Sequence, residues 1–160
     1  MPATGRRSDA GDRTLVAKRP PLYYNPTTRA LFDPKANVLW AVDTFATNVP
    51  TSMPEMAALS PDEFRDGQFF GGSLVSPWGA LLDAQKFGTV VTDFQHLNAE
   101  VIAGCHCPVL RGAQIPEAYD LLRQLPGIPP RAEFTQTDLD QRMAVAESSV
   151  PPEQPRPSGT

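Results

Sequence analysis

The chain has 160 residues, enough for one domain, and its 14 basic and 18 acidic side chains give a net charge of −4. Its 18 prolines and 11 glycines leave enough apolar residues for a small core only. The modest negative charge disfavours direct nucleic-acid binding, which needs a basic field. We expect no membrane span, because no apolar stretch is long enough, and no secretory signal in residues 1–19.

The charge is divided between the start of the chain and the rest. Residues 1–19 carry five basic and two acidic side chains and few apolar ones, so alone in water they cannot bury enough surface to stay ordered. We predict an extended arm over residues 1–36, basic at first and then rich in Pro and Tyr. A core over 37–126, a linker with a C-terminal helix over 127–147 and a Pro-rich tail over 148–160 complete the predicted organisation.

The first element expected after the arm is a central strand over residues 38–45, which is apolar on both faces. A capping box that begins at Ser60 predicts a helix of about two turns. A second Ser-Pro pair, at residues 76–77, predicts the start of another helix, which is expected to end at Gly88.

The second half of the core is expected to add two strands and two helices. The strands are predicted over residues 89–94 and 100–103, one helix over 116–125 and a last helix capped by Thr137. The predicted fold class is therefore α+β, with short helices packed on a small sheet and long extended arms at both ends. Nine apolar residues are expected to be buried together: Trp40, Val42, Trp78, Leu81, Leu82, Val90, Phe94, Leu121 and Leu122.

The densest group of metal-ligating side chains is Cys105, His106 and Cys107. Thiolate and imidazole suit zinc or copper(I), but a structural zinc site needs four ligands, and the only other histidine is His96. The two cysteines are also too close in sequence for a favourable disulfide. We therefore predict no metal and no other cofactor, and two free thiols that favour a reducing compartment.

Asp93 and His96 form a second candidate site, for acid–base catalysis. A carboxylate beside a histidine can fix the tautomer of the ring and help it to act as a general base. On the predicted strand the two side chains would point to opposite faces, because their separation is odd. They could therefore meet only across a turn.

A third pattern is the pair Gly71 and Gly72 followed by the predicted helix. This arrangement resembles the glycine pair and helix of hotdog-fold thioesterases, and Asp83 and residues 90–98 stand where that family has a carboxylate and a strand. The resemblance implies a small thioesterase. Without it, the glycines are interpreted as a turn between packed segments.

The sharpest short motif lies at the end of the basic segment. Residues 20–23 read Pro-Pro-Leu-Tyr, which fits the PPxY pattern that WW domains bind in a polyproline II conformation. This motif predicts a signalling adaptor, whereas an arm that packs on the body of the protein or on a neighbouring subunit is the alternative. The predicted partner-binding residues are Pro20, Pro21, Leu22, Tyr23, Tyr24, Leu31 and Phe32.

The sequence lacks the common catalytic motifs, such as a P-loop, G-x-S-x-G or H-E-x-x-H. A small core with extended, proline-rich arms is typical of proteins that decorate large assemblies. We therefore predict a non-enzymatic structural or accessory subunit whose partners are other proteins. A small enzyme or ligand-binding domain and a signalling adaptor are the alternatives.

Overall fold

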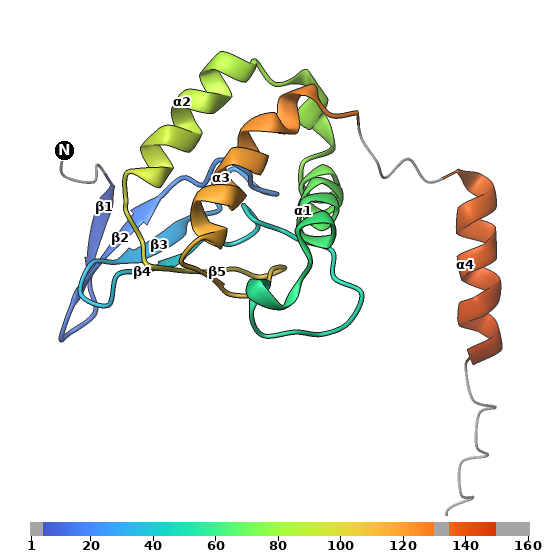
Figure 1. The fold of residues 1–160 in the computed structure, drawn as a ribbon, viewed down its shortest axis with the longest axis horizontal. Coiled ribbons are helices and arrows are strands. Elements are labelled where there is room, and N and C mark those ends of the chain that lie inside the picture. Colours follow the sequence, from blue (N-terminus) through green and yellow to red (C-terminus); the bar gives the residue numbers. More distant parts are fainter. Residues whose placement is uncertain (1–4, 130–134, 150–160) are drawn as a thin grey trace, which may run out of the picture.

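The computed structural model describes residues 5–129 and 135–149, and within them three helices cover one face of a six-stranded sheet (Figure 1). This arrangement confirms the predicted α+β class. The strands are β1 (Arg6–Asp9), β2 (Thr14–Lys18), β3 (Ala30–Asp33), β4 (Val38–Trp40), β5 (Val101–Ala103) and β6 (Leu110–Arg111). The helices are α1 (Pro61–Val75), α2 (Ala84–Gln95), α3 (Gln114–Gln124) and α4 (Gln136–Ser149), with short 3-10 turns η1 (Met56–Ala58), η2 (Pro77–Leu81) and η3 (Leu125–Gly127).

The sheet runs in sequence order from β1 to β6. All neighbouring strands are antiparallel except β4 and β5, which are parallel, with Leu39 opposite Ile102. A parallel pair needs a long crossover connection, and here it contains η1, α1, η2 and α2. The carboxyl ends of β4 and β5 therefore lie at the same edge of the sheet.

Helix α1 begins as the sequence predicts and continues further. The Ser60 backbone N–H donates to Glu63 Oε2 at 2.9 Å and the Glu63 N–H donates to Ser60 Oγ at 3.3 Å, which completes the capping box. The helix has 15 residues rather than about two turns. Its glycines let it approach the loop after β4, because a Cβ on Gly71 would overlap the carbonyl oxygen of Ala46.

The prediction of a strand over residues 89–94 is wrong, because these residues belong to helix α2. Phe87, Val91 and Phe94 are buried at helical spacing along one face. The prediction ended the preceding helix at Gly88, which in the structure lies inside α2. The helix begins instead at Ala84, and Asp83 is its N-cap, whose Oδ1 accepts a hydrogen bond from the Lys86 N–H at 2.9 Å.

The other predicted elements differ from the structure mainly at their ends. Strand β5 and helix α3 lie where they were expected. Strand β4 stops at Trp40 rather than at residue 45, because Val42 has a φ of 57° that no strand can accommodate. The last helix is capped by Thr135 rather than Thr137, since the Asp138 N–H donates to Thr135 Oγ1 at 3.2 Å.

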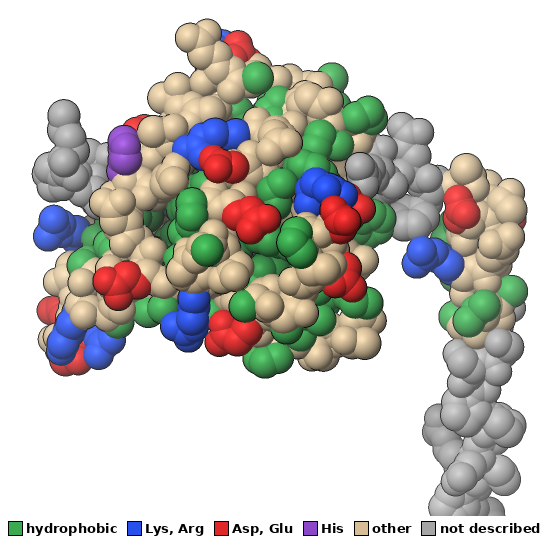
Figure 2. All heavy atoms as spheres, in the orientation of Figure 1, with side chains coloured by type: hydrophobic (Ala, Val, Ile, Leu, Met, Phe, Trp, Pro, Cys, Tyr) green, Lys and Arg blue, Asp and Glu red, His purple; other side chains and the backbone are tan. Residues whose placement is uncertain are grey.

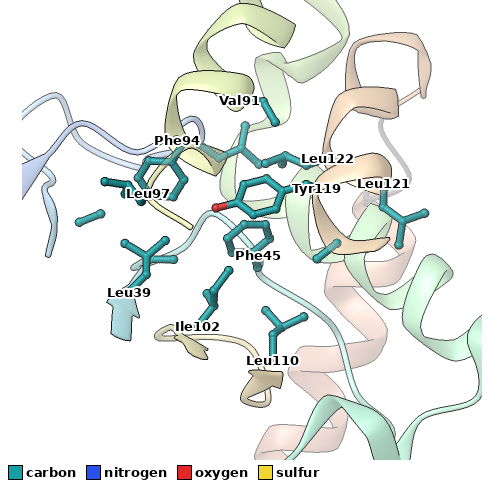
Figure 3. Packing of buried hydrophobic residues seen from close by; sticks show 14 of the residues in the cluster. Leu39, Phe45, Val91, Phe94, Leu97, Ile102, Leu110, Tyr119, Leu121 and Leu122 are labelled. Carbon is teal, nitrogen blue, oxygen red and sulfur yellow. The ribbon is translucent and has the colours of Figure 1, made fainter. Parts of the chain in front are cut away.

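The core lies between the helices and the sheet. Phe45 and Tyr119 meet edge to face at its centre, with ring centroids 5.1 Å apart (Figure 3). Of the nine residues expected to be buried together, three are buried: Phe94, Leu121 and Leu122. Val42 and Leu82 pack partly against the core. The remaining four are exposed, since they lie on outward faces of their elements: Trp40, Trp78, Leu81 and Val90.

Residues 5–36 contribute three of the six strands. They are extended, as predicted for the arm, but they pair with the core through β3 and β4. Leu22 and Phe32 are 2% and 7% exposed and belong to the hydrophobic core. The domain boundaries at residues 36 and 126 stay predictions, and most of the predicted Pro-rich tail lies outside the described residues.

Acidic, basic and apolar side chains are interspersed over the face shown in Figure 2. Within residues 5–129 and 135–149, no helix is long and apolar enough to cross a membrane.

Candidate functional site

Two loops that follow the parallel strands are joined by backbone hydrogen bonds. The Cys105 N–H, from the loop after β5, donates to the Val42 carbonyl oxygen at 2.8 Å. The Thr47 N–H, from the loop after β4, donates in return to the His106 carbonyl oxygen at 2.8 Å. Ligands commonly bind outside the carboxyl ends of parallel strands. The two loops therefore form a candidate site at this edge of the sheet.

Asp43 and His106 form a carboxylate–imidazole pair between these loops. His106 Nε2 lies 3.5 Å from Asp43 Oδ1. The side chain of Asp43 is largely buried, at 14% exposure, whereas that of His106 is 68% exposed. The left-handed backbone at Val42, which is uncommon for a β-branched residue, turns the chain immediately before Asp43. The site thus combines a fixed carboxylate with an accessible imidazole.

A cavity of about 750 Å³ adjoins this pair. Its polar wall includes Asp43, Thr47 and His106, and its apolar wall includes Tyr24 and Leu74. Tyr24 is 75% exposed and comes from the segment before β3, while Leu74 belongs to the last turn of α1. A cavity of this size and mixed lining is typical of a small-molecule site.

Cys105 and Cys107 flank His106 and are free thiols, as predicted. Burial raises the pKa of Cys107 to about 12, with further contributions from Cys105 and Asp43. Burial, followed by the charge of Asp43, also raises the pKa of Cys105. Both thiols are therefore protonated at neutral pH, which makes them poor nucleophiles.

Asp93 and His96 lie elsewhere, at the end of α2 and at its C-cap. The Asp93 carbonyl accepts a hydrogen bond from Lys18 Nζ at 3.2 Å. Among the described residues, no hydrogen bond or ion pair joins the two side chains, and neither residue lines the cavity beside Asp43. The helix places them three residues apart without bringing them together, so the structure gives no acid–base pair here.

The structure also does not support the resemblance to hotdog-fold thioesterases. Gly71 and Gly72 lie inside α1 rather than in a turn before a helix. Asp83 caps α2, and residues 90–95 are helical where the hotdog pattern requires a strand.

The predicted partner-binding residues are divided between the core and the surface. Pro20, Pro21 and Leu22 are buried within this chain, and Arg19 lies over the Tyr23 ring at 5.7 Å. Phe32 is buried, Leu31 is exposed on the sheet, and Tyr24 lines the cavity. Their role in binding a partner stays a prediction.

Asp43 was missed by the sequence analysis. Two features of the sequence point to it. Asp43 follows a strongly apolar strand, and the cluster of Cys105, His106 and Cys107 also follows a strand. These features indicate a shared site only if the two strands are known to be parallel neighbours. The sequence does not show this pairing, because a long crossover connection separates the two strands.

No protein-family model and no curated protein matches the chain. Solved structures do match its fold. The rubredoxin:oxygen oxidoreductase of Desulfovibrio gigas is 19% identical, with a TM-score of 0.58 over 75% of this chain and 30% of that one. The flavodiiron protein of Giardia intestinalis is 14% identical, with a TM-score of 0.56 over 76% of this chain and 29% of that one. The chemotaxis sensor ODP of T. denticola, in its apo state, is 17% identical, with a TM-score of 0.55 over 89% and 54%.

At these identities the likeness shows the fold. The chain spans about 30% of the length of the oxidoreductase and the flavodiiron protein. These neighbours contradict the prediction of a non-enzymatic structural or accessory subunit, because they are described as an oxidoreductase, a flavodiiron protein and a chemotaxis sensor, which another structure shows with a peroxy diiron species. The extended segments that suggested such a subunit include, over residues 5–36, three strands of the sheet.

Proposed function

We propose that this chain forms part of an iron-dependent enzyme or sensor in which Asp43 and His106 are metal ligands. The observation that carries the proposal is the convergence of the two side chains, 3.5 Å apart, at the shared edge of β4 and β5. The fold neighbours support it, because the Giardia intestinalis protein and the Flv1 core from Synechocystis sp. PCC6803 are described as flavodiiron proteins, and one structure of the chemotaxis sensor ODP is described as a peroxy diiron species.

The donor set fits iron in kind. Imidazole and carboxylate together are typical ligands of non-haem iron. A bound iron ion would supply Lewis-acid and one-electron redox chemistry at this edge of the sheet.

The donor set is incomplete in number. Within the described part of the chain, no group of three or more His, Cys, Asp or Glu side chains could hold a metal ion. Asp43 and His106 would therefore share the ion with ligands from outside the described residues. The exposure of His106 is consistent with this arrangement, since its ring is open to a further covering segment.

Each of the two residues has a distinct role in the proposed site. Asp43 is held in a tight turn and offers a charged oxygen at low exposure, so it would fix the position of the ion. His106 would bind through Nε2, the nitrogen that faces Asp43. The cavity lined by Tyr24 and Leu74 would receive the reacting molecule beside the ion.

The test is anaerobic calorimetric titration of the untagged chain with Fe(II). We expect His106→Gln and Asp43→Asn each to weaken iron binding by about tenfold or more, because each removes one of the two ligands that the described residues supply. His96→Gln is the matched control, since it removes the other histidine at the C-cap of α2 and should leave binding unchanged. Equal iron binding by His106→Gln and the wild type would refute the proposal.

A further inference from the structure

The cavity beside Asp43 and His106 is much larger than an iron ion and one diatomic molecule require. Its volume is about 750 Å³, whereas roughly 10–15 Å³ is enough to hold one water molecule. Pockets that bind drug-sized organic molecules have volumes of about 300–1,000 Å³. The size of the cavity therefore favours an organic molecule as the ligand.

The apolar wall of the cavity is held in place by the packing of α1 against the loop after β4. A Cβ on Gly71 would overlap the Ala46 carbonyl oxygen, so the helix lies directly on the loop. Leu74 follows Gly71 by almost one turn of α1 and lines the cavity together with Val49 and Tyr24. Because the helix and the loop are already packed together, little conformational freedom is lost when a molecule binds.

The polar groups of the cavity differ in whether they are free to bind a ligand. Thr47 is fully used, since its N–H donates to the His106 carbonyl at 2.8 Å and its hydroxyl donates to the Phe45 carbonyl at 2.9 Å. Asp43 and His106 would hold the ion. Asn48 also lines the cavity, and its exposed carboxamide has no hydrogen-bond partner among the described residues. This carboxamide, which can both donate and accept, is therefore a neutral polar group that remains for the ligand.

The charges in the cavity disfavour an anionic ligand. Apart from Asp43 and His106, no charged side chain is among the described residues that line the cavity. A charge on the ligand would lose part of its hydration there without gaining a partner, which costs free energy. The Asp43 carboxylate would also repel an anion when no metal is bound.

We infer that the cavity binds an uncharged organic molecule with an apolar body and a hydrogen-bonding group. The apolar body would lie against Leu74 and Val49, with the 75% exposed ring of Tyr24 as a flat surface for stacking. The Asn48 carboxamide would bind the polar group. This inference rests on the proposed function, because the molecule would be the one that reacts beside the ion. Its binding is measured without iron, so the two proposals can fail separately.

The test is an NMR titration of the ¹⁵N-labelled, metal-free chain with benzamide and with benzoate, which have the same shape but differ in charge. We expect benzamide to shift the side-chain amide signals of Asn48, with a Kd on the order of 1 mM for a ligand of this size. Benzoate should bind about tenfold more weakly, because Asp43 repels it and no lysine or arginine lines the cavity. Equal affinity for the two molecules, or no response of Asn48 to benzamide, overturns the inference.

Two variants test whether benzamide binds in this cavity. Leu74→Asp places a charge in the apolar wall and should weaken benzamide binding by about tenfold. Leu81→Asp is the matched control, since Leu81 is 87% exposed on η2 and is not among the residues that line the cavity. Circular dichroism shows whether each variant is folded.

Asn48→Ala keeps the test decisive if Leu74→Asp does not fold, because Asn48 is exposed and its carboxamide supports no other described residue. We expect a loss of affinity of about fivefold, the usual effect of one hydrogen bond. The backbone signals of residues 46–49 report the binding in this variant. Unchanged benzamide affinity in either folded variant contradicts the inference.

Discussion

At the scale of single residues, the backbone around Asp43 explains why the site forms where it does. Val42 has a left-handed φ of 57°, and its carbonyl accepts the Cys105 N–H at 2.8 Å. Gly104 allows this approach, because a Cβ on it would lie 2.6 Å from the Val42 carbonyl oxygen and 2.8 Å from Cys107 Sγ. The hydrogen bond and the glycine together hold His106 beside Asp43.

Replacing Gly104 tests this role. We expect Gly104→Ala to lower the free energy of unfolding by about 1–3 kcal/mol, since the added methyl group meets a backbone atom that cannot move aside. We also expect it to weaken iron binding, because the loop that carries His106 must shift. Urea denaturation and the Fe(II) titration measure the two effects.

Gly88→Ala is the control for Gly104→Ala. Gly88 lies inside α2, and a Cβ on it would meet nothing within 4 Å. Alanine should therefore stabilise the protein by up to about 1 kcal/mol through its higher helix propensity. If Gly104→Ala were as harmless as Gly88→Ala, the close approach of the two loops would not be required.

Among the helices and strands, features that depend on neighbouring residues could be predicted from the sequence, whereas features that depend on packing against distant residues could not. The capping box at Ser60 and the apolar stripe of α3 are local, so they were read correctly. Helix α2 was read as a strand, because β-branched Val90 and Val91 favour strands and Gly88 resembles a helix end. The segment is helical because only a helix places Phe87, Val91 and Phe94 on one face, where all three pack in the core.

Helix α3 is tied to the loop after β4 by the contact of Tyr119 with Phe45. Burial raises the pKa of Tyr119 well above its usual value of 10.0. The neutral phenol is therefore favoured in the folded state, and folding stability is lost as the pH rises above the unfolded pKa. At high pH the unfolded chain binds fewer protons than the folded one, which fixes the sign.

We therefore expect the free energy of unfolding of the wild type to fall above pH 10, by about 1.4 kcal/mol per pH unit for this one group. Tyr119→Phe keeps the ring against Phe45 but removes the ionisable group, so its stability should fall less steeply. Urea denaturation between pH 9 and 11 measures both. Parallel pH dependence of the two proteins would show that Tyr119 does not ionise on unfolding.

At the scale of the whole molecule, the α+β class followed from composition and pattern, whereas the site and the function did not. His106 was singled out in the sequence together with its two cysteines, but its partner Asp43 was missed. The two residues are separated by the crossover that contains α1 and α2, and only the parallel pairing of β4 and β5 brings them together. The same pairing places Trp40 opposite Ala103.

The most direct test of the central claim uses the fact that the chain has only two histidines, His96 and His106. In a long-range ¹H–¹⁵N NMR spectrum of the imidazole rings, each histidine gives its own set of signals, and His106→Gln assigns them. We expect Zn(II) to shift, and Fe(II) to broaden, the ring signals of His106 while those of His96 stay unchanged. Signals of His106 that do not respond to either metal would contradict it.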